Sequence, residues 1–294
     1  MMFIIAQRNG RLCNRLFLLA RLMAAAKEHN HTLVDLSLRK YSPLFDLSRL
    51  WGEGVYLLYR FFGYPIEASP VLEFLIRATL RMLISIQLIF PFTKNFCEVM
   101  TPPGSDRISL DHPVWRTRLQ KKWKIYIFCD WWTLAPESIS KHKEWVLSRL
   151  QPNKETRGRV EEFVRQLRDD RALVIGLVVR REDYESYMDG KYFFSMIQYR
   201  KIADRMTRLC GGKGIRFFIC SIDNEDCSIF DGLDFVYRSG HPIENLYTLA
   251  KCDYLISPPS TYAMWASLVG STPAYYAESP NVEFGLDDFS VMIG

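Results

Sequence analysis

The chain has 294 residues, of which 48% are hydrophobic and 24% are charged, a balance typical of a globular protein of one or two domains. Its formal net charge of +5 suits an anionic ligand or a membrane surface, but it is too small to indicate nucleic-acid binding. The seven cysteines are scattered without a CxxC pair, which argues against a zinc site or a redox motif and favours a reducing cytoplasm. The sequence contains no GxSxG, P-loop or GxGxxG pattern, which argues against an esterase, a kinase-like NTPase and a dinucleotide dehydrogenase.

The N-terminal residues predict a strand, a polar loop and a helix in succession. Residues 3–6 are apolar, residues 7–15 are polar, and residues 16–29 are rich in Leu, Ala and Met. A loop of this kind before a helix directs unpaired amides and the helix dipole toward an anion. Gly10 would allow a ligand to approach the backbone closely, and Asn14 is expected to cap the helix. The alternative is an ordinary turn between a strand and a helix, with arginines at the surface.

Residues 71–92 are strongly apolar and predict a helix. A narrow polar stripe recurs every four residues along it, formed by Glu73, Arg77, Arg81 and Ser85. The uncharged stretch from 82 to 93 is too short to span a bilayer. We expect a mostly buried helix; the alternative is a helix that lies on a membrane surface, together with the aromatic-rich residues 56–62.

Residues 141–170 are polar, helical in pattern and interrupted by Pro152, as expected of a connector between two domains. We therefore predict an N-terminal domain of residues 1–160, with a hydrophobic helical insertion at about 50–95, and a C-terminal domain of residues 161–294.

The C-terminal half alternates between short apolar runs and amphipathic segments. The predicted strands are residues 172–179, 215–221, 234–237, 254–257 and 273–277, and the predicted helices are residues 194–209, 242–251 and 261–269. Repeated strand–helix units predict an α/β fold with a parallel sheet and helices on both faces.

Polar residues follow three of these strands at the point where each strand ends. Arg180, Arg181 and Asp183 follow the first strand, the acidic loop 223–226 follows the second, and Ser260, Thr261 and Tyr262 follow the fourth. Because ligands of open α/β sheets bind outside the carboxyl ends of the strands, these residues can converge on one ligand. Paired guanidinium groups favour a diphosphate as the ligand. The alternative for the arginines is a surface ion pair, and the alternative for Ser260 and Thr261 is a helix cap.

The acidic loop that contains Asp223 could hold Mg²⁺, since hard cations need clustered carboxylates. We favour a solvated loop, or an acceptor for the hydroxyls of a ribose or the edge of a base, and predict no metal site. The five histidines form no HxH, HxxE or HExxH pair.

Three segments together resemble motifs of the fucosyltransferase superfamily, which includes bacterial α-1,2-fucosyltransferases, α-1,6-fucosyltransferases and protein O-fucosyltransferases. Residues 10–16 (GRLCNRL) resemble its GRxGNQ or GxLGNQ opening, residues 178–184 (VVRREDY) its HxRRxD[YWK] motif, and residues 257–265 (SPPSTYAMW) its late SS[FT]xxW block. The three segments keep the order of the family and reach across nearly the whole chain.

The resemblance implies a GT-B fold of two Rossmann-like halves, with the acceptor mainly on the first and GDP-fucose mainly on the second. It also implies an inverting transfer of fucose to a hydroxyl of a glycan, without a metal ion or other cofactor. Arg180 would bind the β-phosphate and stabilise the departing GDP, and Asp183 would orient the arginines or contact the nucleotide. The residues expected at the donor are Gly10, Arg11, Asn14, Arg180, Arg181, Asp223, Ser260, Thr261 and Tyr262, with Arg180, Asp183 and Asn14 in catalytic roles.

The sequence departs from the family pattern at the histidine of the second motif, where Val178 stands, and in the first motif, where Cys13 and Arg15 replace Gly and Gln. Two alternatives follow: a transferase that uses another nucleotide sugar, or a degenerate protein that binds a nucleotide sugar without turnover. The general base is left open among Glu182, Glu185 and Asp189. The sequence fixes neither the acceptor nor the oligomeric state.

Overall fold

The computed structural model describes residues 2–6, 10–38, 40–46, 55–57, 70–100, 107–120, 123–129, 133–168, 173–211, 214–281 and 283–292. The chain divides into two compact units, which we call unit 1 (Met1–Asn153) and unit 2 (Lys154–Gly294). The predicted boundary was residue 160, whereas the division falls at Asn153, shortly after α4 ends at Arg149. Much of the predicted insertion, residues 50–54 and 58–69, lies outside the described residues.

Unit 1 is built on a parallel sheet with the strand order β3-β2-β1-β6-β4. These strands are β1 (Met2–Ile5), β2 (Thr32–Asp35), β3 (Val55–Leu57), β4 (Cys97–Met100) and β6 (Ile125–Phe128), and β5 (Ile108–Ser109) pairs separately with β7 (Thr133–Leu134). The helices are α1 (Leu12–His29), α2 (Pro70–Ile89), α3 (Pro113–Leu119) and α4 (Pro136–Arg149).

The helix α1 begins four residues earlier than the sequence indicated. Arg11 is its N-cap and makes no side-chain cap hydrogen bond, so Asn14 lies within the first turn, and the prediction that it caps the helix was wrong. The helix is apolar around most of its circumference and is buried from Leu16 through Ala26. Even Arg21 is buried here, which lowers the pKa of its guanidinium to about 10.

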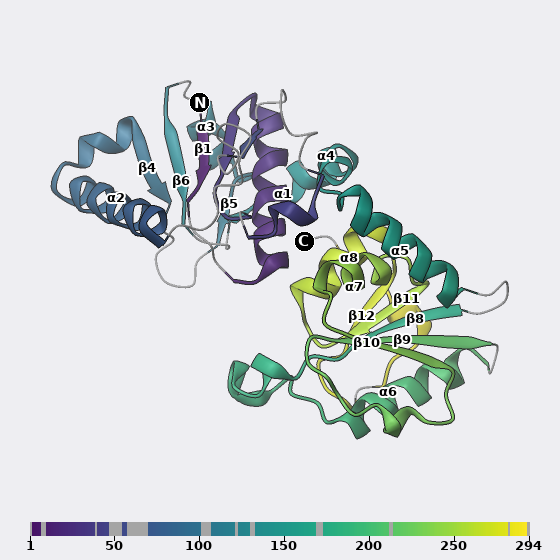
Figure 1. Cartoon of the computed structure of the whole chain (residues 1–294). Helices are drawn as coiled ribbons and strands as arrows, with labels where there is room; N and C mark the ends of the chain where they lie inside the picture. Colours follow the sequence, from purple (N-terminus) through teal and green to yellow (C-terminus); the bar gives the residue numbers. More distant parts are fainter. Residues whose placement is uncertain are drawn as a thin grey trace. The chain divides into compact units, whose positions relative to one another are not determined.

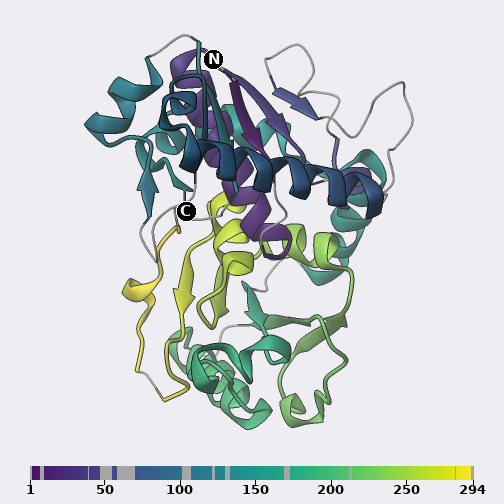
Figure 2. The same cartoon turned by 90° about the vertical axis from the view of Figure 1, so that its left-hand side faces the viewer.

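The helix α2 presents an apolar face to solvent, contrary to the expectation of a mostly buried helix. It packs through Leu83, Ile84 and Gln87, and Gln87 donates to the carbonyl of Cys97 (2.9 Å) in β4. Figure 2 shows α2 facing the viewer in front of the strands of unit 1. Large apolar side chains on α2 and the following 3-10 turn are more than half exposed: Phe74, Leu75, Met82, Leu88, Ile89, Phe90, Phe92 and Phe96. Of the predicted polar stripe, Arg81 and Ser85 are exposed among these apolar side chains. No helix among the described residues is long and apolar enough to cross a membrane.

Unit 2 is built on a second parallel sheet, with the strand order β10-β9-β8-β11-β12. Its strands are β8 (Leu173–Val178), β9 (Ile215–Ser221), β10 (Phe235–Ser239), β11 (Tyr254–Ser257) and β12 (Ala274–Tyr276). Its helices are α5 (Lys154–Leu167), α6 (Met196–Leu209), α7 (Pro242–Leu249) and α8 (Thr261–Gly270). The helix α6 covers one face of the sheet, and α5, α7 and α8 cover the other (Figure 1). The predicted α/β fold with parallel sheets is therefore confirmed.

A glycine in the central strand of unit 2 allows its neighbours to pack closely against it. Gly176 lies in the middle of β8, where a Cβ would meet the side chains of Leu255 at 2.6 Å and Leu249 at 2.7 Å. The glycine lets β11 and α7 approach β8 closely. The strand order reverses between β8 and β11, so the carboxyl ends of these two strands form the switch point at which α/β sheets bind ligands.

Candidate functional site

A pocket opens at the carboxyl edge of the unit 2 sheet, beside this switch point. The ends of β8 and β9, the turn before α7 and the first turns of α7 and α8 contribute its lining, which comprises Val178, Val179, Arg180, Cys220, Ser221, Ile222, Gly240, Pro242, Asn245 and Tyr262. Its enclosed part is narrow, with a cavity volume of about 20 Å³. That space admits one water molecule or one small polar group.

Arg180 is the charged residue of this lining, and its side chain is held from several sides. The exposed fraction of its side chain is 12%, and its guanidinium donates to both carboxylate oxygens of Asp183 (2.9 and 3.2 Å) and lies over the ring of Tyr184. The backbone amide of Arg180 donates to the hydroxyl of Tyr199 (3.0 Å), which donates back to its carbonyl (3.2 Å). Its Nε is buried and has no hydrogen-bond partner among the described residues. The guanidinium of Arg180 is thus held in one orientation at the end of β8.

Arg181 lies differently, although it is the next residue. Its guanidinium donates to Glu225 (2.7 Å), whose side chain is 10% exposed, and lies over the ring of Phe193. It is not part of the pocket lining. The structure therefore separates the two predicted arginines into one at the pocket and one in an ion pair with the acidic loop.

The turn between β10 and α7 forms another wall of the pocket. Gly240 and His241 both have positive φ (67° and 47°), a conformation that costs a non-glycine residue such as His241 about 1–3 kcal/mol. Asn245 holds this turn: its Nδ2 donates to the carbonyl of Gly240 (2.7 Å), and its backbone amide donates to the carbonyl of His241 (3.0 Å). Its Oδ1 is buried and has no hydrogen-bond partner within the described parts of the chain. An acceptor without a partner, at a pocket, is placed to receive a hydrogen bond from a ligand.

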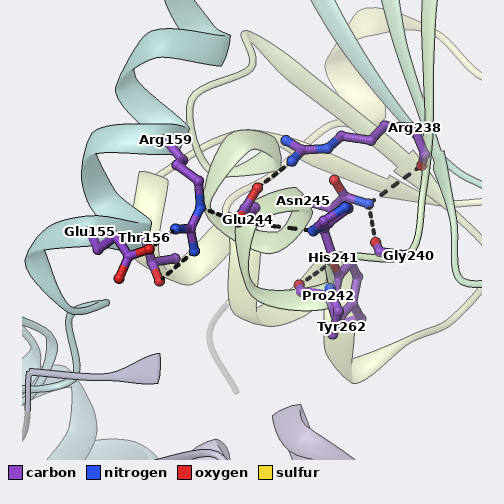
Figure 3. A network of polar contacts seen from close by, with 10 residues as sticks. All are labelled: Glu155, Thr156, Arg159, Arg238, Gly240, His241, Pro242, Glu244, Asn245 and Tyr262. Carbon is purple, nitrogen blue, oxygen red and sulfur yellow. Dashed lines mark hydrogen bonds and ion pairs between the residues drawn. The ribbon is translucent and has the colours of Figure 1, made fainter. Parts of the chain in front are cut away.

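Glu244 precedes Asn245 and is buried between two arginines (Figure 3). Its Oε1 accepts from the Nε of Arg159 (2.6 Å) on α5, and its Oε2 accepts from Arg238 at the end of β10. Burial alone would raise the pKa of this carboxyl, but the two guanidinium groups outweigh that effect and hold the pKa below its usual value.

The predicted residues before α8 are present at the same edge of the sheet. Ser260 is the N-cap of α8, and its hydroxyl accepts from the amide of Tyr262 (3.1 Å), as in the alternative of a helix cap. Thr261 opens the helix, and the hydroxyl of Tyr262 donates to the carbonyl of Pro242 (2.6 Å), which joins α8 to the first residue of α7.

The predicted N-terminal corner belongs to unit 1. Gly10 has a φ of +66°, and a Cβ there would lie 2.1 Å from the Nδ2 of Asn14. Arg15 donates to the carbonyl of Gly10 through Nη2 (2.9 Å) and to that of Ser37 through Nη1 (3.1 Å). Arg15, which stands where the family motif has Gln, therefore holds the loop next to Arg11 in place. Residues 7–9 of the predicted loop lie outside the described residues.

The remaining predicted residues lie on exposed loops of unit 2. Asp223 is exposed, and its carbonyl accepts from the hydroxyl of Tyr237 (2.8 Å). Glu185 and Asp189 are exposed and Glu182 is half-buried, and none of the three lines the pocket, so the choice of a general base stays open. No group of three or more His, Cys, Asp or Glu side chains that could hold a metal ion occurs in the part of the chain that the structure describes.

Sequence reasoning missed the residues that β9, the β10–α7 turn and α7 bring to the pocket. Cys220 and Ser221 end β9 and Ile222 follows it, at a strand exit that was noted for its acidic loop instead. Asn245 gave one usable signal, because it is the single amide side chain of the predicted helix at 242–251 and needs hydrogen-bond partners once it is buried.

Comparison with solved structures shows the fold. A mutant of Arabidopsis thaliana FUT1 in complex with GDP matches 98% of this chain and 73% of its own, at 13% identity and a TM-score of 0.57. The fucosyltransferase NodZ from Bradyrhizobium matches 95% of this chain and 96% of its own, at 16% identity and a TM-score of 0.56. POFUT1 in complex with GDP-fucose matches 92% and 94%, at 10% identity and a TM-score of 0.55.

These proteins are fucosyltransferases, the group that the three sequence motifs resemble. At such identities the likeness establishes the two-sheet GT-B-like fold and leaves the activity to be argued from the site. No protein-family model and no curated protein matches the sequence.

Proposed function

We propose that the chain is a glycosyltransferase that binds GDP-fucose at the unit 2 pocket and transfers fucose to a hydroxyl of a glycan. The observation that carries this proposal is the pairing of a fixed guanidinium, Arg180, with an unpaired buried acceptor, Asn245 Oδ1, in one pocket at the strand ends. A nucleoside diphosphate offers the complementary groups: anionic oxygens and a base with N–H donors. The solved fucosyltransferases with the same fold, bound to GDP or GDP-fucose, support this choice.

The narrowness of the pocket suggests how the base is held. The enclosed space fits one small polar group, so we propose that an exocyclic amino group or ring N–H of the base enters it and donates to Asn245. Val178 and Ile222 then provide apolar walls for the base. In this arrangement, Val178 takes the position of the histidine of the family motif and offers contact area instead of a hydrogen bond.

The proposed transfer is inverting and uses no metal ion. The acceptor oxygen attacks C1 of fucose on the face opposite the diphosphate, the bond from C1 to the GDP oxygen breaks with its electron pair, and a base takes the acceptor proton. Negative charge grows on the departing β-phosphate as the sugar gains oxocarbenium character. A guanidinium held by Asp183 and Tyr184 would stabilise that charge without having to reorganise. In this role it would replace a metal ion as the positive charge beside the leaving group.

Calorimetric titration with GDP, UDP, ADP and CDP tests the donor, with EDTA present throughout. We expect GDP to bind at least tenfold more tightly than the other three, and the protein to release GDP from GDP-fucose when an oligosaccharide acceptor is added. Tighter binding of another nucleotide would mean that the donor is a different nucleotide sugar, and the assignment of the fold would be unaffected. Tight GDP binding without any donor turnover across an acceptor screen would instead indicate a non-catalytic nucleotide-sugar-binding protein.

We also propose that the enzyme is cytoplasmic and makes peripheral contact with an anionic membrane through α2 and the turn that follows it. Two features support this: the exposed apolar face from Phe74 to Phe96, and the charge of unit 1, which has 21 Lys and Arg against 12 Asp and Glu and thus a formal charge of +9. An amphipathic surface binds a bilayer when apolar insertion and attraction to anionic lipid act together.

Co-sedimentation with vesicles tests this contact. We expect binding to vesicles with 30% anionic lipid at low salt, weaker binding to neutral vesicles, and loss of binding in a Leu88→Ser/Phe92→Ser variant. Ile197→Ser is the matched control, since Ile197 is 59% exposed but lies on unit 2. Equal sedimentation of wild type and the double variant would refute the contact, and concentration-dependent dimers in the absence of lipid would assign the face to a second copy of the chain.

A further inference from the structure

Glu244 and Asn245 are neighbours in α7, but they face two different cavities. Asn245 lines the pocket at the sheet edge, whereas Glu244 lies in an open groove of about 430 Å³ on the side of α5. This groove is lined by Glu155, Gly158, Arg159, Glu162, Phe163, Gln166, Arg238 and Glu244, and it shares no residue with the pocket. A contact in the groove can therefore affect the pocket only through residues that lie between the two cavities.

Arg238 provides that connection. Its guanidinium donates to Glu244 and lies over the ring of Phe163, while its backbone carbonyl accepts from Asn245 Nδ2 (3.4 Å). The same Nδ2 donates to the carbonyl of Gly240 in the strained turn (Figure 3). Both donor hydrogens of the amide are used in this way, so the backbone positions of Arg238 and Gly240 together set where Asn245 Oδ1 points.

Arg159 adds α5 to this network of hydrogen bonds. It comes from α5 and donates to Glu244 through Nε and to Glu155 through Nη1, so one carboxylate of α7 ties α5 to the end of β10. Glu244 is 6% exposed, and removal of its charge would leave the guanidinium groups of Arg159 and Arg238 without the carboxylate that lies between them. The end of β10 and the turn after it would then shift apart from α7.

We propose that Glu244 is a positioning residue for the donor: by holding Arg238 and Arg159, it fixes the Gly240–His241 turn and aims Asn245 Oδ1 into the pocket. The inference rests on the proposed function, because it takes the pocket to hold the base of the donor nucleotide. Glu244 touches neither the base nor the phosphates. It sets the affinity for the base and leaves the affinity for the diphosphate, which Arg180 provides, unchanged.

Calorimetric titration of GDP and of inorganic pyrophosphate into the full chain separates these two parts. For Glu244→Gln we expect GDP binding to weaken about tenfold, the worth of one hydrogen bond to a buried group, and pyrophosphate binding to change less than twofold. Glu155→Gln is the matched control: it removes the other, exposed partner of Arg159 and should change neither affinity. If Glu244→Gln does not fold, Arg159→Ala replaces it, with an expected loss of about threefold for GDP alone.

The outcomes distinguish the inference from its premise. If wild-type protein binds GDP no more tightly than pyrophosphate, the pocket does not bind the base, and the proposed function is contradicted as well. Wild-type protein that prefers GDP, together with a Glu244→Gln variant that loses affinity for both ligands equally or for neither, would overturn the positioning role alone. A fall in thermal midpoint without a change in the ratio of the two affinities would assign Glu244 a purely structural role, which also overturns the inference.

Discussion

The two units share a five-stranded parallel sheet but carry opposite charge. Unit 1 has a formal charge of +9, whereas unit 2 has 17 Lys and Arg against 21 Asp and Glu and a formal charge of −4. The pocket proposed for an anionic nucleotide lies in the acidic unit, and the exposed apolar helix lies in the basic one. The modest net charge of the whole chain conceals this asymmetry.

The difference implies that the proposed anion binding in unit 2 depends on the guanidinium of Arg180 held in place, because the net negative charge of the unit repels a diphosphate. In unit 1, the excess positive charge is spread over many residues and acts on an extended surface. Local geometry is therefore expected to govern function in unit 2, whereas bulk charge and exposed apolar area are expected to govern it in unit 1.

The largest expected effect is that of Arg180→Ala. We expect transfer to fall by a hundredfold or more, about 3 kcal/mol of barrier, because the variant loses the fixed charge at the departing phosphate. Donor turnover and the thermal midpoint are measured in parallel. Arg181→Ala is the matched control: it leaves Glu225 without its ion-pair partner and should lower the midpoint, with less than a tenfold effect on transfer. Equal loss of activity in both variants would instead indicate a clamp made of two arginines.

The second effect concerns the corner of unit 1. Gly10→Ala places a Cβ where Asn14 lies and a side chain on a backbone of positive φ, and we expect it to lower the free energy of unfolding by about 2 kcal/mol. Urea unfolding measures this change. Gly158→Ala is the matched control in unit 2: it lies inside α5 with nothing within 4 Å of the added Cβ, and should raise stability by about 1 kcal/mol. A neutral Gly10→Ala variant would mean that Asn14 and the loop rearrange freely.

The sequence predicted unit 2 better than unit 1. The predicted strand at 215–221 coincides with β9, and the predicted strand at 172–179 contains β8, because buried parallel strands are continuous apolar runs. Arg180 could be placed at the pocket from its position alone, as the first charged residue after β8. Unit 1 depends instead on contacts that no local pattern contains. The helix α1 begins at Leu12 without a capping side chain, and the apolar residues of α2 give no sign of which face is covered.

Within the site, the sequence pattern does not show which of two partners a side chain turns toward. Arg181 resembled Arg180 in the sequence, but it pairs with Glu225, which the loop after β9 brings near. Asn245 and Glu244 lie side by side in one helical turn, and only the tertiary packing decides that one faces the pocket and the other faces α5. Arg180 and Tyr262 were therefore visible in the sequence, whereas Asn245 and the residues at the end of β9 were not.

The smallest effect expected is a difference in acid stability that isolates Glu244. Its pKa is lower in the folded chain than in the unfolded chain, so the stability it contributes is fully present above the unfolded value, about 4.3, and is lost as the pH falls through the folded value. Wild type and Glu244→Gln should therefore differ by a constant amount in free energy of unfolding between pH 6 and pH 8, and the difference should shrink below pH 4. His241 lies 4.0 Å from the carboxylate, and its side chain is exposed. A gap that stays constant down to pH 3 would mean that the charge of Glu244 contributes nothing, and that the two arginines are held in place by Phe163 and α5 alone.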